Sequence, residues 1–522
     1  METMNEFFKF VNQESDKLLQ QALVHSGLTF LSLFIAILVS VPLGILISRR
    51  RKLSGTVLGI AGILQTIPSI ALLGFMIPLL GIGARPAIVA LFLYALLPII
   101  RNTYTGIVGV DANVKEAAMA MGMTDWQILW KVELPLAFPV ILAGIRTATV
   151  ITVGVATLAA YIAAGGLGEF IFGGIALNNS AMILAGAIPA ALLALFFDFL
   201  LSRLQHVRIK KIKRVLVTGC ILFIAISSLY FVPSVFGSKL LAGFPPEFMG
   251  RNDGFPALKN RYHLKINTVV IGQALLYDAL KEKQIDVISG YSTEGRIKAF
   301  HLKILQDDKH IFPPYFAAPL VREDILKSYP ELQSTLNLLS GKINDSLMTE
   351  MNYRVDYLHE SPGEVAKDFL EKKGLYQNPR NGHKGTVRIG SKIFTEQYIL
   401  AEMYKMLIEG YTDLNVTQRT GLGGTQICFG ALTNNQIDLY PEYTGTGLQV
   451  ILSTPQRVVD SLGGNENEVY NYVKSEFKKQ FNIEWLKPIG FNNTYAVMMR
   501  QHQSERLGIT TISRLVNYLS KK

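Results

Sequence analysis

Six long apolar segments follow one another in the first 236 residues of this chain of 522 residues. Each is long enough, at about 20 residues, to cross the roughly 30 Å hydrocarbon core of a membrane as a helix. A soluble helical core rarely holds six such segments in succession, so residues 25–236 are expected to form an α-helical membrane domain. The predicted spans are 27–48, 57–81, 86–108, 138–162, 180–202 and 215–236.

Basic residues are concentrated in two of the loops between these spans. The loop after the first span holds Arg49, Arg50, Arg51 and Lys52, and the loop after the fifth holds Arg203, Arg208, Lys210, Lys211, Lys213 and Arg214. The positive-inside rule places both loops in the cytoplasm. The segment 111–136 then also lies inside, whereas the N-terminus and residues 237–522 lie outside. The net charge of +11 is thus interpreted as a topology signal, and no nucleic-acid partner is expected.

The membrane domain is flanked by a short polar N-terminus and a long segment of ordinary soluble composition. Residues 1–24 are mildly amphipathic, and we expect them to lie on the extracytoplasmic membrane surface or to form a loose tail. In residues 237–522, strand-like segments alternate with helical patterns, which is typical of α/β lobes. The clearest are strands at 285–289, 387–390 and 437–439 and a helix at 395–409.

Turn-forming residues and cysteines constrain this second half further. Residues 374–385 read GLYQNPRNGHKG and predict a linker. Cys220 lies in the sixth span and Cys428 in the soluble segment, so no internal disulfide is expected. No Cys/His spacing of the metal-binding type occurs, and no metal site is predicted.

The cytoplasmic segment contains a specific motif. Residues 116–135 read EAAMAMGMTDWQILWKVELP, which is similar to the coupling loop of ABC importer permeases. In that family the segment forms a short helix that docks on the ATPase subunit. Small residues permit close approach of two surfaces, and proline ends a helix before the next span. The matching positions are Glu116, Ala117, Ala118, Gly122, Leu134 and Pro135.

The same resemblance implies partners. No Walker A pattern (GxxxxGK[ST]) occurs in the sequence, so this chain is expected to bind no cofactor, and ATP and Mg are expected on a separate cytoplasmic ABC ATPase. Permeases of this family work in pairs, which implies a homodimer bound to two ATPase subunits. The expected location is a bacterial cell (inner) membrane, crossed several times and surrounded by its lipids.

Six sequence blocks in the second half form recognisable motifs. They are GSKIFTEQYILAEM (390–403), DLYPEYTGTGL (438–448), FNNTYAVMMR (491–500), EFMGRNDGFPAL (247–258), VISGYSTEGRIKAF (287–300) and DDKHIFPPYFAAPLV (307–321). These blocks resemble the binding proteins of glycine betaine, carnitine and choline importers. The resemblance implies a type II periplasmic-binding-protein-like α/β domain of two lobes, fused to a type I importer permease.

The order of these blocks departs from the family. There the FTEQ and YTGT blocks come first and the FPPY block comes last, whereas here the order is reversed, so the domain is expected to be circularly permuted. Permutation is tolerated because domain termini often lie close together. Crossovers between the lobes are expected near 304–312 and 486–491. Lobe one is then about 312–486, and lobe two combines 239–311 with 487–522.

The resemblance also implies a ligand cage of aromatic side chains from both lobes. A quaternary ammonium donates no hydrogen bond, so aromatic faces bind it through cation–π attraction. The matching positions are Tyr315 and Tyr443 in lobe one and Tyr291 and Tyr495 in lobe two. Tyr440 is a weaker candidate, and any single tyrosine is alternatively a packing residue.

Polar residues in the matching loops are candidates for the other end of the ligand, where we expect a carboxylate. They are Lys392, Thr395, Gln397, Thr446 and Asn493, together with the backbone amides of 421–425. The alternative for Lys392 is a solvated side chain without a ligand role.

The sequence therefore favours the fused permease and substrate-binding subunit of an ATP-driven importer. The expected substrate is a small zwitterion or cation with a trimethylammonium head: glycine betaine, carnitine, choline or ergothioneine. An importer of polar amino acids is the main alternative, and a membrane ligand sensor is a weaker one. No catalytic residues are predicted, because the external half offers no Ser-His-Asp elbow, metal cluster or phosphate loop.

Overall fold

A computed structural model describes residues 2–177, 179–205, 240–462 and 464–520. Two compact units are present, a helical one formed chiefly by the first part of the chain and an α/β one formed chiefly by the second.

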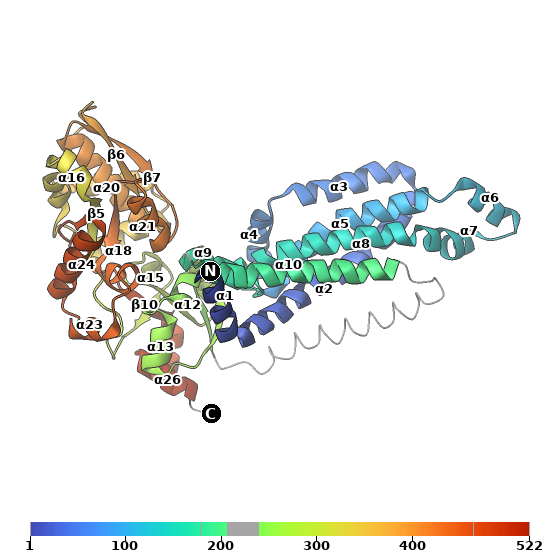
Figure 1. Cartoon of the computed structure of the whole chain (residues 1–522), viewed down its shortest axis with the longest axis horizontal. Coiled ribbons are helices and arrows are strands. Elements are labelled where there is room, and N and C mark those ends of the chain that lie inside the picture. The colour runs from blue at the N-terminus through green and yellow to red at the C-terminus, as the bar shows by residue number, and fades with distance from the viewer. Residues whose placement is uncertain (1, 178, 206–239, 463, 521–522) are drawn as a thin grey trace. The chain divides into compact units, whose positions relative to one another are not determined.

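Long apolar helices make up the helical unit (Figure 1). Among the described residues, four are long and apolar enough to cross a membrane, or five when a bent pair is counted as one span. The four are α2 (Ser15–Arg49), α5 (Ala84–Val108), α8 (Leu134–Ala156) and α10 (Ser180–Gln205). They overlap the first, third, fourth and fifth predicted spans, while the predicted span 215–236 lies outside the described residues.

The second predicted span is broken. Helices α3 (Ser54–Thr66) and α4 (Ser69–Leu80) meet at an angle of 95°. Pro68 lies at the break, where proline disfavours a helical conformation of the preceding residue and ends the first helix. The expectation of one continuous span over 57–81 is therefore corrected to two helices with a sharp bend.

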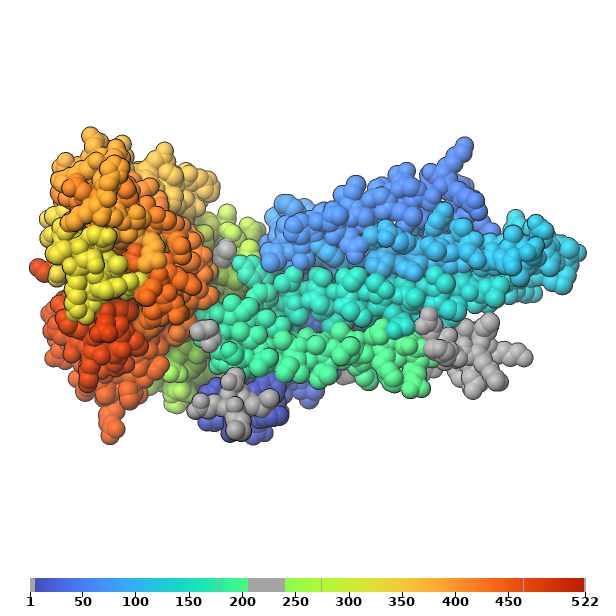
Figure 2. Space-filling model, turned by 45° about the horizontal axis from the view of Figure 1, so that its top comes forward, coloured from blue at the N-terminus to red at the C-terminus, as the bar shows by residue number. Residues whose placement is uncertain are grey.

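Close packing at α5 organises the bundle. Helix α5 packs against α2, α3 and α8, and α8 packs against α10. Figure 1 shows these helices side by side, and Figure 2 shows α3, α5, α8 and α10 as adjacent blue, cyan, teal and green bands. A Cβ at Gly44 of α2 would lie 2.5 Å from the Cβ of Thr103, and one at Gly144 of α8 would lie 2.5 Å from the Cβ of Asn102. Glycine at these two positions therefore lets both neighbours approach α5 closely.

The N-terminal residues are helical. Helix α1 (Glu2–Gln13) is followed by α2, which begins at Ser15 and continues without a break into the first span. The side chain of Gln21 accepts a 2.6 Å hydrogen bond from the backbone N–H of Gly166. Residues 15–24 are thus the first turns of the spanning helix, and the expectation of a loose tail is wrong for them.

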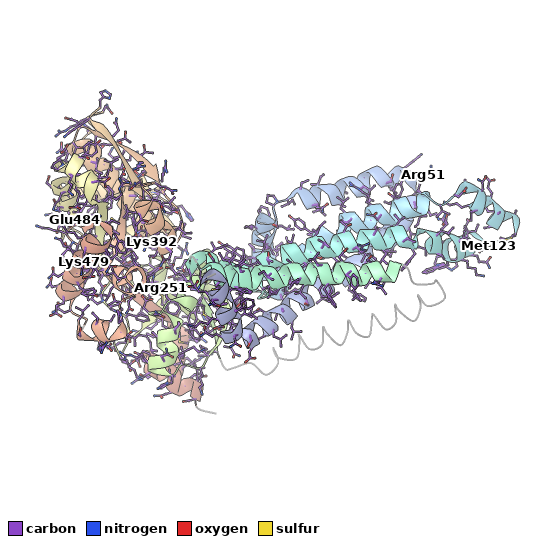
Figure 3. The ribbon with its side chains drawn as sticks, in the orientation of Figure 1. Arg51, Met123, Arg251, Lys392, Lys479 and Glu484 are labelled. Atoms are coloured by element: carbon purple, nitrogen blue, oxygen red, sulfur yellow. The ribbon has the colours of Figure 1, made fainter. Side chains whose placement is uncertain are left out.

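The motif segment between α5 and α8 folds into short helices. These are α6 (Ala112–Ala120), α7 (Asp125–Ile128) and the π-helical turn η2 (Leu129–Glu133). Met123 in this segment and Arg51 in the basic loop lie at the same end of the helical unit (Figure 3). The two loops therefore share one side, as the positive-inside interpretation requires. The remaining short elements of this unit are η1 (Arg51–Leu53), η3 (Thr157–Ile162) and α9 (Gly168–Leu177).

Two five-stranded sheets form the α/β unit. We call the sheet β2-β1-β3-β10-β4 and its helices lobe two, and the sheet β7-β6-β8-β5-β9 and its helices lobe one. The strands of lobe two are β1 (Leu241–Phe244), β2 (Asn267–Val270), β3 (Val287–Tyr291), β4 (Leu302–Leu305) and β10 (Tyr495–Arg500). Those of lobe one are β5 (Ala317–Arg322), β6 (Gly385–Gly390), β7 (Leu414–Arg419), β8 (Leu439–Tyr443) and β9 (Ile483–Trp485).

Helices accompany both sheets. With lobe two go α12 (Pro246–Gly250), α13 (Phe255–Tyr262), α14 (Gln273–Lys281), α15 (Arg296–Ala299), α25 (Gln501–Leu507) and α26 (Ile512–Ser520). With lobe one go α16 (Glu323–Ser328), α17 (Glu331–Leu336), η5 (Asn337–Leu339), α18 (Asp345–Asp356), α19 (Pro362–Lys372), α20 (Thr395–Tyr411), α21 (Thr425–Thr433), α22 (Thr444–Thr446), η6 (Gly447–Ile451), α23 (Gln456–Ser461) and α24 (Glu466–Phe481).

Strand β8 extends beyond its predicted end through a proline. The sequence pattern stops it at 439, before Pro441, yet β8 continues to Tyr443 and pairs Pro441 with Pro319 of β5. Proline has no N–H to donate, so it fits only where the ladder needs none. Two prolines facing each other meet that condition, and the side-chain amide of Gln397 donates to the carbonyl of Pro441 at 2.8 Å.

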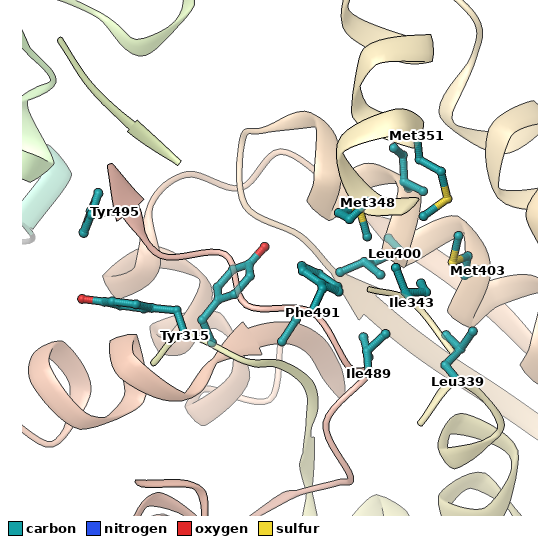
Figure 4. Packing of buried hydrophobic residues seen from close by; sticks show 14 of the residues in the cluster. Tyr315, Leu339, Ile343, Met348, Met351, Leu400, Met403, Ile489, Phe491 and Tyr495 are labelled. Atoms are coloured by element: carbon teal, nitrogen blue, oxygen red, sulfur yellow. The ribbon is translucent and has the colours of Figure 1, made fainter. Parts of the chain in front are cut away.

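Two crossovers join the lobes and lie side by side. The chain passes between the sheets after β4 and again between β9 and β10. Phe316 and Asn492 form an antiparallel bridge, and the backbone N–H of Tyr315 donates to the Asn492 side chain at 2.7 Å. Ile489 and Phe491 of the second crossover are buried among Leu339, Ile343 and Leu400 of lobe one (Figure 4). This packing fixes where β10 begins, and so positions Tyr495.

Candidate ligand-binding site

Register brings two of the predicted tyrosines together in lobe two. Tyr291 is the last residue of β3 and Tyr495 the first of β10, and these strands pair antiparallel with the two residues directly opposite. Their rings stack with centroids 5.2 Å apart and planes 23° apart. Both side chains therefore lie at one edge of the sheet, where open α/β domains usually bind ligands.

Lobe one continues the stack. Tyr443 ends β8, and Phe394 immediately precedes α20. The Phe394 ring lies 5.3 Å from that of Tyr291 and 6.2 Å from that of Tyr443, with planes 26° apart in both pairs. We call the series Tyr495, Tyr291, Phe394 and Tyr443 the aromatic column; the lobes meet in it between Tyr291 and Phe394. Phe394 was missed by the sequence reasoning, although it opens the FTEQ motif.

Tyr315 lies beside this column rather than in it. Its ring contacts Tyr495 edge-on, at 5.9 Å and 78° (Figure 4). Its hydroxyl donates to Asp253 of lobe two. Of the four predicted cage tyrosines, three thus belong to the column and the fourth contacts the end of it.

A cation lies over each terminal ring of the column. The Arg251 guanidinium is 4.9 Å from the centroid of Tyr495, and the Lys392 ammonium is 5.2 Å from that of Tyr443. Figure 3 labels both side chains. Lys392 was a predicted site residue, whereas Arg251 was missed, although it lies within the EFMGRNDG block. Two faces of the column therefore already make cation–π contacts.

Carboxylates neutralise both cations. The Lys392 ammonium lies 2.6 Å from Glu442, and both side chains are almost fully buried. Arg251 forms ion pairs with Asp253 at 2.6 Å and with Glu247 at 3.2 Å. The buried tyrosine Tyr440 also donates to Glu442, at 2.8 Å. A ligand carboxylate would have to compete with these partners for either cation.

Glu396 connects the lobes beneath the column. This buried carboxylate of lobe one accepts hydrogen bonds from Thr293 Oγ1 (2.6 Å) and Asn493 Nδ2 (2.9 Å), which follow β3 and precede β10. It also accepts from the Tyr443 hydroxyl (2.5 Å) and from Asn352 Nδ2 (3.2 Å). Burial raises the pKa of Glu396, although these hydrogen bonds oppose the shift. Glu396 was also missed, despite its place in the FTEQ motif.

The remaining predicted polar residues support the column. Gln397 donates to the Tyr443 hydroxyl at 3.1 Å and accepts from the backbone N–H of Lys392 at 3.2 Å. Asn493 accepts from the backbone N–H of Thr293 at 3.4 Å. Thr446 is buried in α22, three residues after Tyr443, and Thr395 donates to Asp356. Gln397 and Asn493 thus orient groups of the site.

The predicted nest of amides at 421–425 is partly occupied. Gly421 and Gly423 have positive φ values of 69° and 144°, as a nest requires. The backbone N–H of Gly421 donates to the Ser391 hydroxyl and that of Leu422 to the Ser391 carbonyl, both at 3.0 Å. Two of its donors therefore hold the loop before Lys392.

A cavity of about 570 Å³ lies on the crossover side. Both crossovers line it, including Phe312 and Asn492, and Tyr495 reaches it from the column. An ion pair of 3.3 Å between Arg261 of lobe two and Asp460 of lobe one contributes to its walls. The crossovers therefore face open space on this side.

The described part of the chain holds no group of three or more His, Cys, Asp or Glu side chains suited to a metal ion. What the site offers is a set of aromatic faces and paired charges. Aromatic faces between two lobes are chemically suited to contact a small cation through cation–π attraction.

Two protein-family models match the chain. The model described as "Binding-protein-dependent transport system inner membrane component" matches residues 40–236. The model described as "Substrate binding domain of ABC-type glycine betaine transport system" matches residues 230–372 and 385–521. Its two blocks leave out residues 373–384, which overlap the predicted linker.

Curated relatives are similar to about two fifths of the chain. A glycine betaine/carnitine/choline transport system permease protein of Bacillus subtilis is 46% identical over 38% of this chain and 92% of its own length. A carnitine transport permease protein of Listeria monocytogenes is 47% identical over 39% of this chain and 93% of its own length. An osmoprotectant import permease protein of Salmonella typhimurium is 50% identical over 35% of this chain and 87% of its own length.

Proposed function

The chain belongs to the family of ABC importers for glycine betaine-type osmoprotectants, as a permease fused to a substrate-binding domain, and from this premise we propose that it imports a trimethylammonium compound. The candidates are glycine betaine, carnitine, choline and ergothioneine. As a permease subunit with several membrane helices, it works with an ATPase partner on a small molecule. The observation that carries the proposal is the aromatic column, whose terminal rings already contact cations.

Ligand capture in this proposal uses the boundary between the lobes. The Tyr291 and Phe394 rings are 5.3 Å apart, which leaves no room for a trimethylammonium group between them. The lobes must therefore separate there, admit the cation and close on it. Bending is confined to the two crossovers, while Glu396 exchanges its bonds to Thr293 and Asn493 in each cycle. Tyr291, backed by Tyr495, then faces the bound head group from lobe two, and Phe394, backed by Tyr443, faces it from lobe one.

The polar end of the ligand is assigned to the Lys392 side of the column in this proposal. Lys392, Gln397, Thr446 and Asn493 are the candidate contacts. Because Lys392 is paired with Glu442, a ligand carboxylate gains less from it than from a free ammonium. Residues around the tail, rather than the column, then discriminate among the four candidate solutes.

The proposed assembly is a homodimer with two cytoplasmic ABC ATPases that bind ATP and Mg. Glu116, Ala117, Ala118, Gly122, Leu134 and Pro135 form the docking segment. The α/β unit, in permuted order with its old termini joined at the linker, lies outside a bacterial inner membrane and stays tethered to its permease. Tethering raises its effective concentration at the permease and removes a diffusional search.

Polar amino acids are the competing substrates, and binding to the full-length chain distinguishes the two classes. Calorimetry in detergent with the four trimethylammonium compounds and with glutamine and arginine is the direct test. We expect at least one trimethylammonium compound to bind, and Tyr495→Ala to weaken it about 30-fold, the equivalent of one desolvated cation–π contact of about 2 kcal/mol.

The matched control for that experiment is Tyr357→Ala. Tyr357 stacks on Tyr353 in lobe one, is 47% exposed and lies outside the column, so its loss should leave affinity within about twofold. Binding of an amino acid but none of the four compounds would overturn the proposed substrate class. Equal losses of affinity in Tyr495→Ala and Tyr357→Ala would show that the aromatic column has no specific role in ligand binding.

A further inference from the structure

A charge cluster joins the motif segment of the helical unit to the first span. Glu133, the last residue of η2, is 1% exposed. Its carboxylate accepts two hydrogen bonds from Arg49, the last residue of α2, one of them at 3.2 Å from Nη1. The Lys115 ammonium of α6 lies 3.2 Å from Glu133 Oε1. Side chains from α2 and α6 thus meet the carboxylate of η2. We call this group of Arg49, Lys115 and Glu133 the Glu133 clamp.

Lys115 extends the clamp to a fourth segment. Its ammonium also donates to the carbonyl of Ile107, near the end of α5, at 3.1 Å. Next to it on α6, Ala118 is buried, while Glu116 and Ala117 of the EAA motif are exposed. Helix α6 therefore attaches to the bundle through Lys115 and Ala118 and leaves its motif face free.

The burial of Glu133 makes its ion pairs with Arg49 and Lys115 costly to break. A carboxylate removed from water is stable only while its charge is compensated, and losing one partner is costly. Arg49, Arg50 and Arg51 are all exposed and carry the positive charge that predicts a cytoplasmic loop. Of the three, Arg49 is the one paired with the buried Glu133. Topology alone does not require a buried partner for Arg49. The π-helical turn that ends at Glu133 is also a feature often found at functional sites.

We propose that Glu133 is a positioning residue for coupling. It makes α6, the end of α2 and the start of α8 move as one body when the ATPase shifts the motif segment. Without the carboxylate, α6 still docks through its exposed face, but its displacement no longer reaches the first span. This proposal rests on the proposed function only in that an ATPase acts on the motif segment.

The test uses the full chain reconstituted with its ATPase partner in liposomes. Uptake of labelled solute and ATP hydrolysis are measured together, for Glu133→Gln, Arg49→Gln, Lys115→Gln and the control Arg51→Gln. We expect Glu133→Gln to lower the solute imported per ATP about tenfold while the ATPase still co-purifies, because the docking face is intact. Arg49→Gln and Lys115→Gln should each lower it about threefold, and Arg51→Gln should leave it unchanged. Combining Arg49→Gln with Glu133→Gln should add no further loss, since both remove one interaction.

A second measurement needs no substrate and keeps the clamp testable if the solute assignment is wrong. Arg50→Cys, in a chain with Cys220→Ser and Cys428→Ala, is labelled by a maleimide with and without ATP and vanadate. We expect trapping to change the labelling rate at the end of α2, and Glu133→Gln to abolish that change, whereas the charge-preserving Glu133→Asp should retain part of it.

Several outcomes would overturn the clamp. They are an unchanged ATP-dependent labelling shift in Glu133→Gln, loss of ATPase co-purification in that variant, or an equal effect of Arg51→Gln and Arg49→Gln. Should Glu133→Gln fail to fold, Lys115→Gln and Glu133→Asp carry the same two measurements. Absence of uptake by the parent chain with a normal labelling shift would contradict the proposed substrate and leave the clamp supported.

Discussion

Two buried carboxylates, one in each unit, gather side chains from separate segments by different means. Glu133 is held by two cations, Arg49 and Lys115. Glu396 is held by four neutral donors, two from each lobe. A buried ion pair is costly to break because each charge loses its counter-charge, whereas water can replace the uncharged donors around Glu396 when the lobes part. The first arrangement suits segments that move together, and the second suits lobes that part in every cycle.

A third buried carboxylate makes this comparison sharper inside one lobe. Glu442 immediately precedes Tyr443 of the column and is paired with Lys392 at 2.6 Å, so it belongs with Glu133. Both Glu442 and Glu396 contact Tyr443, one through its backbone N–H and one through its hydroxyl. Tyr443 is therefore anchored on one side by a permanent pair and on the other by a releasable one.

Lys392→Met is expected to have the largest effect, because it leaves Glu442 buried without a cation. We expect lobe one to lose about 3–5 kcal/mol of unfolding free energy. Trp485, fully buried in lobe one, reports urea unfolding by fluorescence once Trp126→Phe and Trp130→Phe remove the other two tryptophans. Lys392→Met with Glu442→Gln should regain most of the loss. If Lys392→Met unfolds at the same urea concentration as the parent chain, the pair with Glu442 does not stabilise lobe one, and the role of Lys392 is in ligand binding instead.

Glu396→Ala comes next, because it leaves donors from both lobes unsatisfied in the closed state. We expect about 100-fold weaker binding of the trimethylammonium ligand, the sum of two or more lost hydrogen bonds to a charged group. Glu396→Gln retains one acceptor oxygen and should lose about tenfold. Calorimetry on the full chain measures both. Glu402→Ala on the same helix, α20, is the control, and an equal loss there would contradict a specific role of Glu396 between the lobes.

Phe394→Ala should have a smaller effect, confined to the column. Removing one ring from between Tyr291 and Tyr443 is expected to weaken binding about tenfold, or about 1–2 kcal/mol of cation–π energy. Phe394→Leu keeps an apolar side chain and should lose nearly as much, because the π face is what the cation contacts. The neighbouring Ile393 is 58% exposed, so Ile393→Ala should leave affinity unchanged. Full affinity in Phe394→Leu would show that the Phe394 ring contributes apolar packing and not a cation–π contact.

Much of the site could be predicted from motifs, and what could not depended on distant partners. Tyr291, Tyr443 and Tyr495 were predicted because each lies within a recognisable block. Phe394 and Glu396 lie in an equally recognisable block, but their roles depend on how the crossovers bring lobe two against α20. No local pattern encodes that approach. Arg251 was likewise missed, because its position over Tyr495 is set by tertiary packing.

In the helical unit, too, the features that could not be predicted depend on residues far apart in the sequence or on a local bend. Hydropathy located the apolar segments because length and composition alone decide them, but it does not register a bend, so α3 and α4 were predicted as one span. Polar residues at 15–24 suggested a tail, yet Gln21 finds its partner in Gly166, far along the chain. Arg49 was interpreted as a topology signal only, because its buried partner Glu133 is equally remote in sequence.

The pH dependence of ligand affinity is the smallest predicted effect. It tests directly whether uncharged hydrogen-bond donors, rather than a cation, hold the two lobes together. Glu294 of lobe two lies near Asp356 and Glu396 of lobe one, and burial, followed by the charge of Asp356, raises its pKa to about 8, although Arg296 opposes the shift. Burial also raises the pKa of Asp356 and of Glu396. At pH values below about 8, the closed lobes hold a proton on Glu294 that the open state holds less tightly, because opening removes the nearby charges of Asp356 and Glu396.

Stabilisation of the closed state by this proton is therefore complete below the ordinary pKa and is lost as the pH rises through the raised one. Because the charges of Asp356 and Glu396 cause only part of the shift, opening removes only that part, and we expect ligand affinity to fall about threefold to fivefold between pH 6 and pH 8.5, the equivalent of about 1 kcal/mol. Calorimetry across that range measures it. Glu294→Gln should flatten the profile, because its amide does not titrate. An affinity that rises with pH would mean that a cation, rather than neutral donors, governs this boundary, and the contrast with Glu133 would then fail.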